Sequence, residues 1–288
     1  MCTDVGLPVT TSTGFSVSSF SVGGGSAVQG VAVYKQKIYV ATENNSEISV
    51  YSSDEHVFLH ALVVPGLKQA SDMTFCRRNS CLYLIDWVVR SIFRAEIEGV
   101  KEIIDWSTEG EFGGLSASGD GSVVLAGHET NSLKEYTTWG TLIRTVKLKS
   151  DVGEVIRPWH AVKLASEMFV ASHGSSSDTA LHRVCLVDSG GQIVKSFGGL
   201  RGRGNNSLWG PYHLCMTDEN RLFIADCNNG RIVVLDENLE FLSEISGSLR
   251  KPRRICLDKP SNKLFVTDNR LIAKKAADGR IVIFSQVL

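Results

Sequence analysis

The sequence lacks the features that would indicate a membrane protein, a disulfide-stabilised secreted domain or a general polyanion binder. No apolar run approaches the ~18–20 residues that a membrane-spanning helix needs, and the segment Met1–Gly6 has neither the basic nor the apolar part of a secretory signal. The seven cysteines are an odd number and form no CxxC pair, which argues against a disulfide framework or a zinc knuckle. The formal net charge is only −1. We therefore expect a cytoplasmic protein that does not bind membranes.

Short apolar runs recur along the chain with one shape, in which large apolar residues are followed by a small residue and a polar one. Six such runs start 44, 41, 45, 54 and 42 residues apart: Ile38–Thr42, Leu82–Asp86, Val123–Gly127, Met168–Ser172, Leu222–Asp226 and Leu264–Asp268. Further strand-like runs lie before and after each of them. Four short strands in ~40–45 residues are typical of a β-propeller blade. The sequence thus predicts an all-β, six-bladed propeller with four antiparallel strands per blade.

The repeats account for the chain as one domain over residues 1–288. The expected blades cover residues 26–65, 66–106, 107–149, 150–199, 205–247 and 248–288. The last blade lacks a fourth strand, because only four residues follow the run Ile281–Phe284. The segment Phe15–Val22 alternates apolar and polar residues, so we expect it to supply this strand and to close the ring. Closure would cover strand edges that otherwise promote aggregation.

The fifth blade carries a motif made of three segments: Pro211–Leu214, Asp218–Asp226 and Asn228–Leu235. This motif resembles the NHL repeat, which is found in the C-terminal propellers of tripartite-motif proteins. The sixth blade matches it in part, and the second keeps its aspartate as Asp86. The other three blades have a different residue at that place: Thr42, Gly127 and Ser172. The resemblance implies a propeller that contacts proteins or RNA through one loop face.

The motif aspartate has a structural explanation. Asp226 ends a strand just before the turn Asn228–Gly230, whose residues favour positive φ. Its carboxylate can accept backbone N–H groups or pair with Arg231. We expect a turn anchor rather than a catalytic group.

One position in each blade falls at the mouth of the central channel. When the blades are aligned, the first residues of the six innermost strands are Gly30, Asp72, Gly114, His160, His213 and Arg254. In one interpretation, His160, His213 and Asp72 hold zinc or calcium in a metal-dependent lyase or hydrolase. The chain resembles peptidyl-hydroxyglycine amidating lyases only in having a histidine two residues after a proline near the axis. In the other interpretation, these side chains bond to one another around the channel, without metal or cofactor.

The loops on the same face divide into a basic part in blades four to six and an acidic part in blades one to three. Arginine dominates the basic part, which favours two-point contacts to phosphate or carboxylate and stacking on bases. Aromatic residues lie beside these arginines and are typical anchors of binding surfaces. We expect a partner contact centred on the following residues: Trp159, Arg201, Arg203, Trp209, Tyr212, Arg253 and Arg254.

No nucleophile elbow, phosphate-binding loop, catalytic Cys–His signature or RING pattern occurs in the sequence. The sequence therefore favours a monomeric, non-catalytic interaction module without catalytic residues. Its expected partner is a protein or a single-stranded RNA.

Overall fold

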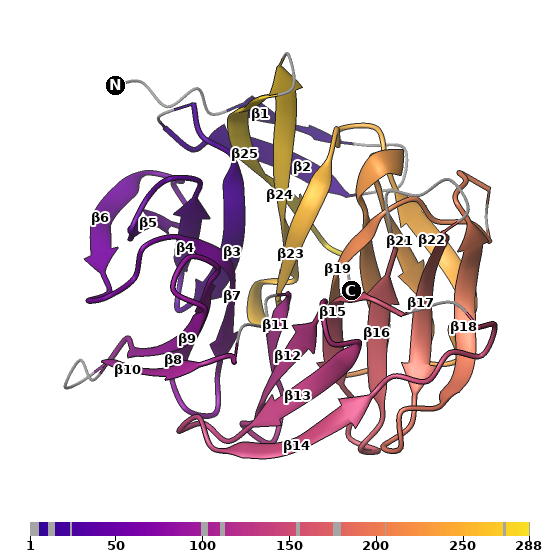
Figure 1. Cartoon of the computed structure of the whole chain (residues 1–288). Coiled ribbons are helices and arrows are strands. Elements are labelled where there is room, and N and C mark those ends of the chain that lie inside the picture. The colour runs from indigo at the N-terminus through magenta and orange to yellow at the C-terminus, as the bar shows by residue number, and fades with distance from the viewer. Residues whose placement is uncertain are drawn as a thin grey trace.

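The computed structural model describes residues 6–10, 15–23, 25–98, 103–109, 113–153, 156–174, 180–204, 206–272 and 275–287. These residues form an all-β propeller of six blades, which confirms the predicted fold (Figure 1). The helices in this part of the chain are two short 3₁₀ turns, η1 (Cys227–Asn229) and η2 (Lys259–Ser261). No helix among the described residues has the length and apolar character to cross a membrane.

Every blade is an antiparallel sheet, and in blades one to five the four strands follow one another in sequence. Blade one comprises β3 (Val28–Tyr34), β4 (Lys37–Thr42), β5 (Glu47–Ser52) and β6 (Phe58–Val63). Blade two comprises β7 (Ala70–Cys76), β8 (Cys81–Asp86), β9 (Ser91–Glu96) and β10 (Ile103–Ser107). Blade three comprises β11 (Leu115–Ala117), β12 (Val123–Gly127), β13 (Ser132–Tyr136) and β14 (Leu142–Lys147).

The second half of the ring repeats this plan. Blade four comprises β15 (Pro158–Lys163), β16 (Phe169–His173), β17 (Leu181–Val187) and β18 (Ile193–Leu200). Blade five comprises β19 (Pro211–Met216), β20 (Leu222–Asp226), β21 (Arg231–Leu235) and β22 (Phe241–Ile245). Blade six comprises β23 (Pro252–Asp258), β24 (Lys263–Ile272) and β25 (Lys275–Ser285), to which β2 (Ser16–Ser21) and β1 (Gly6–Thr10) are added.

The position of a strand within its blade determines how it is buried. The first strands contact one another around the whole ring, in the order β3, β7, β11, β15, β19, β23 and back to β3, so they line the channel. The second strands β8, β12, β16 and β20 are buried at every residue, because neighbouring blades cover both of their faces. This burial explains why they appear in the sequence as continuous apolar runs. The outermost strands, such as β6 and β14, are largely exposed.

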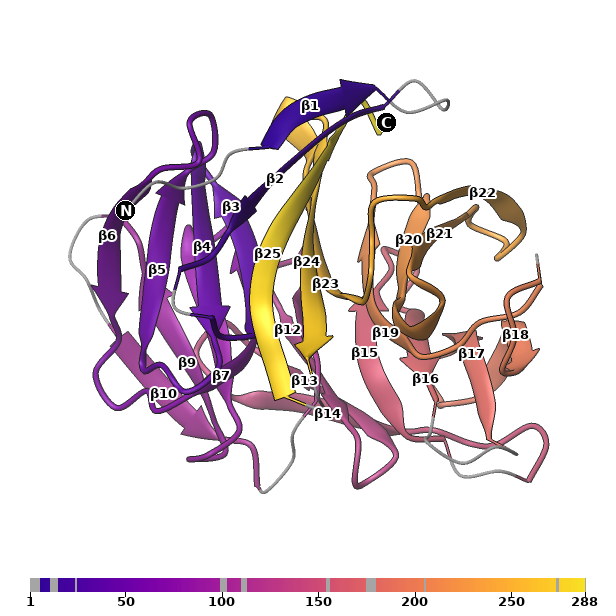
Figure 2. The same ribbon diagram turned by 90° about the horizontal axis from the view of Figure 1, so that it is seen from above.

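The N-terminal segment closes the ring as predicted. Strand β2 pairs antiparallel with β25, from Ser16 opposite Ser285 to Ser21 opposite Arg280. Figure 2 shows β2 lying along β25 although the two come from opposite ends of the chain. Phe20 is the main anchor, with 1% of its surface exposed. Strand β1 pairs with the outer side of β2 and makes a fifth strand in this blade, which the sequence did not predict.

The motif aspartates are turn anchors, as expected. The Asp226 carboxylate accepts a hydrogen bond from the Trp209 N–H at 2.7 Å and pairs with the Arg231 Nε at 2.8 Å. It therefore joins the loop before β19 to the turn after β20. Two other aspartates accept backbone N–H groups from the equivalent loop of their own blade: Asp86 and Asp268. These bonds hold in place the loops that surround the channel mouth.

Candidate functional site

A bulge near the start of the inner strands places two consecutive side chains at the channel mouth. The pairing register shifts across the second residue of five inner strands, β3, β7, β15, β19 and β23. In a β-bulge, two residues of one strand lie opposite a single residue of the neighbouring strand, which changes the direction of their side chains. The third residue of each strand then lies in the channel. The second residue lines a cavity at the mouth: Gln29, Ser71, Trp159, Tyr212 and Arg253.

Four of the six predicted mouth residues form a buried layer across the channel, which we call the channel layer: Asp72, His160, His213 and Arg254. The Arg254 Nε lies 2.9 Å from the Asp72 Oδ1, and the His213 Nε2 lies 3.5 Å from the Asp72 Oδ2. The rings of His160 and His213 pack with their centroids 3.7 Å apart. The structure thus brings together side chains from blades two, four, five and six.

Backbone groups bond to the same side chains. The Asp72 carboxylate accepts the N–H of Leu115, on the inner strand of the next blade, at 2.9 Å. The Nδ1 of His160 accepts the Leu214 N–H at 3.3 Å, and its Nε2 lies 3.2 Å from the Leu115 carbonyl oxygen. A ring that accepts at Nδ1 and donates at Nε2 is a neutral imidazole. The channel layer therefore links neighbouring inner strands.

The electrostatics of the channel layer keep the carboxylate charged and the imidazoles neutral. Burial alone would raise the pKa of Asp72, but the Arg254 guanidinium and the facing imidazoles hold it well below its usual range. Burial lowers the pKa of His160 well below its ordinary value, and the neighbouring His213 adds to this effect. Burial also lowers the pKa of His213, against the opposing influence of Asp72. The layer is a charged Asp–Arg pair beside two neutral rings.

The two remaining mouth positions are glycines, and at Gly114 a side chain is excluded for steric reasons. A Cβ atom on Gly114 would lie 2.4 Å from the His160 Cδ2 and 2.7 Å from the Trp159 carbonyl oxygen. A Cβ atom on Gly30 would lie 3.2 Å from the Met73 Cγ. Glycine at position 114 therefore leaves the space that the His160 ring fills.

The channel layer fits a hydrogen-bonded network better than a metal site. Asp72, His160 and His213 offer ligand atoms within 4.8 Å of one another, which is close enough for a shared ion. The Arg254 guanidinium, however, already neutralises Asp72 and would repel a cation at that place. Both nitrogens of His160 have backbone partners that a metal ion would have to displace. The contacts thus favour the second of the two interpretations of these residues.

Two cavities open on the face that carries the loops before each first strand and between each second and third strand, which we call the loop face. The mouth cavity measures about 250 Å³ and reaches down to Arg254. The blade cavity measures about 410 Å³ and lies between the loops of blades four and five. Trp159 and Tyr212 line both cavities and form the wall between them. On the other side of the channel layer, a cavity of about 460 Å³ opens to the opposite face.

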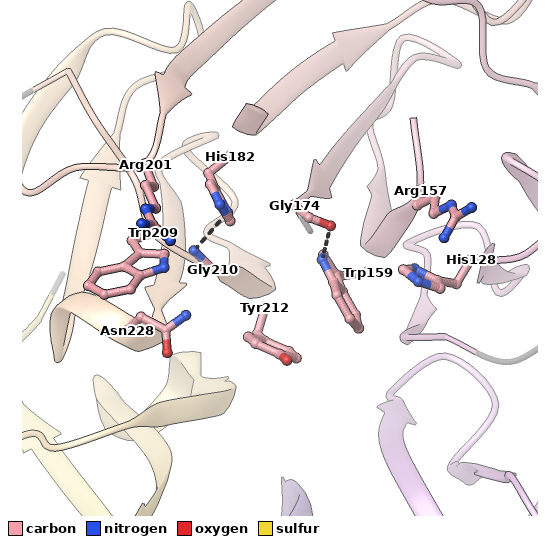
Figure 3. A pocket seen from close by; sticks show the side chains of 10 residues that line it. All are labelled: His128, Arg157, Trp159, Gly174, His182, Arg201, Trp209, Gly210, Tyr212 and Asn228. Carbon is pink, nitrogen blue, oxygen red and sulfur yellow. Dashed lines mark hydrogen bonds between the residues drawn. The ribbon is translucent and has the colours of Figure 1, made fainter. Parts of the chain in front are cut away.

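Aromatic rings and arginines are stacked in a row across the loop face. His128 packs on Trp159 at 4.4 Å between ring centroids, and Trp159 packs on Tyr212 at 4.7 Å. The Arg253 guanidinium carbon lies 5.3 Å from the centre of the Tyr212 ring, within cation–π range. The indole N–H of Trp159 donates to the Gly174 carbonyl at 2.9 Å, which fixes this ring (Figure 3). The row spans blades three to six.

Of the other expected partner-binding residues, Arg201 and Trp209 line the blade cavity, whereas Arg203 and Arg254 do not. Arg201 and Trp209 are exposed and in contact, with the guanidinium carbon 5.5 Å from the ring centre (Figure 3). Arg203 is exposed, and its guanidinium donates to the Asn229 carbonyl. Arg254 belongs to the channel layer instead. It is 8% exposed and neutralised by Asp72, so we remove it from the partner contact.

The arginines of blades four to six are not equally available to a partner. Three arginines from this part of the loop face pair with aspartates within the fold: Arg183 with Asp151, Arg231 with Asp226, and Arg280 with Asp268. Four charged residues that contributed to the expectation lie outside the described residues: Glu111, Glu154, Asp178 and Lys274. The exposed arginines of the blade cavity therefore carry most of the argument for an anionic partner.

Sequence reasoning missed several lining residues. Gln29 and Ser71 occupy the same bulge position as Trp159, and aligning the residue before each mouth position would have found them. Gln69, Trp87, His128 and Arg157 come from loops whose course the repeat does not dictate.

The fold is shared with solved propellers. A catalytically inactive variant of virginiamycin B lyase from Staphylococcus aureus, in which alanine replaces a histidine, was solved with quinupristin. It is similar over 94% of this chain and 99% of its own, at 10% identity and a TM-score of 0.62. A streptogramin B lyase structure matches over 94% of this chain and 97% of its own, at 10% identity and a TM-score of 0.63.

A further similar structure is Kuenenia stuttgartiensis hydrazine synthase. The match covers 85% of this chain and 93% of the hydrazine synthase chain, at 12% identity and a TM-score of 0.60. Such low identities establish the propeller fold alone. No protein-family model matches the chain. No curated protein matches it either.

Proposed function

We propose that this propeller is a cytoplasmic, monomeric interaction module that binds a protein or a single-stranded RNA through the part of the loop face in blades four to six. The observation that supports this most strongly is the row of stacked rings and guanidinium groups from His128 to Arg253. Half-exposed aromatic and arginine side chains held in fixed positions are the usual centres of binding energy in interfaces. The NHL resemblance of the fifth blade agrees with a binding role for this face.

The blade cavity adds chemistry suited to an anionic partner. Arg157 and Arg201 line it, and Trp159 and Trp209 add flat apolar surfaces to its wall (Figure 3). Arginine binds phosphate and carboxylate through two parallel N–H groups. The same rings accept either a nucleobase or an apolar side chain, which is why the proposal includes both classes of partner.

Charge reversal tests this contact. Replacing Arg201, Arg203 and Arg253 with glutamate is expected to weaken binding of any partner recovered by pull-down roughly tenfold or more, because each change puts repulsion where attraction is proposed. Binding by the parent protein should also weaken with added salt. The measurement is an equilibrium binding titration, with the melting temperature recorded to show that the fold is intact.

The matched control reverses three exposed basic residues on the opposite face: Lys37, Arg78 and Arg221. This variant is expected to bind like the parent protein. The proposal is wrong if the loop-face variant binds as well as the parent, or if reversing Glu43 and Glu109 on the acidic side is the change that abolishes binding.

A second candidate function is a metal-dependent lyase or hydrolase at the channel. It is favoured by the clustering of Asp72, His160 and His213, and by the similarity of the fold to lyases. It is disfavoured by the ion pair between Arg254 and Asp72.

Elemental analysis separates the two functions. We expect protein purified without a histidine tag to contain no stoichiometric zinc or calcium, because Arg254 already supplies the positive charge that Asp72 requires. The control is the variant with His160→Ala and His213→Ala. One equivalent of metal in the parent protein that is lost from this variant would favour the enzyme.

A further inference from the structure

We infer that the mouth cavity binds the C-terminal residue of a partner polypeptide, with Arg253 as the group that holds the terminal carboxylate. This inference rests on the proposed function, since it assigns one class of partner, a protein, and one part of that partner to the loop face. The evidence is an unsatisfied charged donor, the chemistry of the cavity wall and the size of the cavity.

Arg253 is the charged donor. Its Nε atom is buried and has no hydrogen-bond partner among the described residues. Its guanidinium lies over Tyr212 and lines the mouth cavity. The neighbouring Arg254 also lines the cavity, but the Asp72 carboxylate already neutralises it. A buried donor without a partner requires an explanation, and an absent anionic ligand is one.

The wall of the cavity divides into two kinds of surface. Trp87, Trp159 and Tyr212 supply aromatic surface, whereas Gln29 and Gln69 supply amide groups that both donate and accept hydrogen bonds. The C-terminal residue of a polypeptide carries a carboxylate, a peptide group and a side chain on one carbon atom. The cavity offers a guanidinium, amides and aromatic rings around a space of about 250 Å³, so the ligand and the wall match group by group.

The size and position of the cavity favour a chain end over other acidic ligands. An aspartate or glutamate inside a polypeptide would bring two flanking chain segments, whereas a chain end brings one. Capture of a C-terminal carboxylate is a recurring mode of peptide recognition, and arginine binds carboxylates well. Glu43 also lines the cavity, and its carboxylate should repel a second acidic group. We therefore expect the preferred terminal residue to be apolar, and terminal aspartate or glutamate to bind weakest.

The test uses twenty synthetic peptides of the form acetyl-Gly-Ser-Gly-Xaa, each with a free C-terminal carboxylate, and the twenty corresponding amides. Binding to the full chain is followed by protein-observed NMR titration. The acids with apolar Xaa are expected to bind, and their amides at least roughly tenfold more weakly, because the charged hydrogen bonds to Arg253 are lost. Glu43→Gln is expected to strengthen binding of the peptides that end in aspartate and glutamate.

Two arginine variants separate the cavity from general charge. Arg253→Gln is expected to remove the preference for acid over amide, whereas replacing Arg250, an exposed arginine in the loop before β23, with glutamine should keep it. The inference is overturned if acids and amides bind equally, or if no acid binds. It is also overturned if acetyl-Asp-amide binds as well as the terminal acids, or if oligouridine binds the mouth cavity in their place.

The outcomes distinguish this inference from the proposed function. If charge reversal at the loop face abolishes partner binding while no peptide acid binds, the interaction module stands and the C-terminal ligand is wrong. If peptide acids bind with the expected preference while charge reversal leaves the partner bound, the partner contact lies elsewhere and the mouth cavity remains a carboxylate site.

Discussion

Replacing Asp72 with alanine is expected to destabilise the propeller by about 3–5 kcal/mol, which is the cost of leaving a buried charge without its partner. The Arg254 guanidinium would lose its counter-ion at 2.9 Å. The N–H groups of Met73 and Leu115 would lose the carboxylate oxygens that accept them. Urea denaturation followed by tryptophan fluorescence measures the change in the free energy of unfolding.

Two further variants show whether the unpaired charge is the cause. Removing both partners, with Asp72→Ala and Arg254→Met, should recover part of the loss, since an uncharged pair no longer strands a cation. Asp218→Ala removes an exposed aspartate and should change stability little. If the double variant is no more stable than Asp72→Ala, the lost backbone hydrogen bonds outweigh the charge, and our account of the channel layer is wrong.

Removing the closing strand should have the other large effect. Deletion of residues 1–24 takes away β2 and leaves β25 as an open edge with unpaired backbone groups, so soluble yield and melting temperature should both fall. A milder variant, Phe20→Ala, is expected to cost about 3–5 kcal/mol, because it empties a buried site. In that site the ring packs against His56 at 5.1 Å and Tyr51 at 5.2 Å between ring centroids.

The matched control for Phe20 is Val63→Ala on the outer strand β6, where 60% of the residue's surface is exposed. This change should cost well under 1 kcal/mol, since little apolar surface is buried there. A deletion variant that melts like the parent protein would mean that β25 is protected in another way and that β2 is dispensable.

The features that the sequence predicted correctly are those that depend on the burial pattern of a single strand or on residues close together in the chain. Strands such as β8 and β20 are covered on both faces, so nearly all of their residues are apolar, apart from the aspartate that ends each of them. Phe15–Val22 is covered on both faces, since Val17 packs into the core between blades five and six and Phe20 into the core between blades six and one. Asp226 was recognisable as an anchor because its turn and Arg231 lie within five residues of it. Local patterns sufficed for the blades, the closure and the turn anchors.

The roles of the site residues could not be predicted from local sequence patterns, because these roles depend on contacts between distant parts of the chain. The sequence places Arg253 and Arg254 side by side with equal chemistry. The bulge at the start of β23 directs Arg253 to the mouth cavity and Arg254 into the channel. There Arg254 pairs with Asp72 and donates to the carbonyl of Ser71, which is 183 residues away in the sequence.

The sequence by itself determined the number of blades, the strand that closes them and the six positions at the channel mouth, because a repeat imposes the same burial on every copy. Only the tertiary structure decided which arginines are paired inside the fold and which are exposed. Arg183, Arg231, Arg254 and Arg280 are neutralised inside the fold, whereas Arg201 and Arg203 stay exposed on the loop face. An ion pair forms where the folded chain brings two side chains within a few ångströms, and the strand repeat carries no information about that distance.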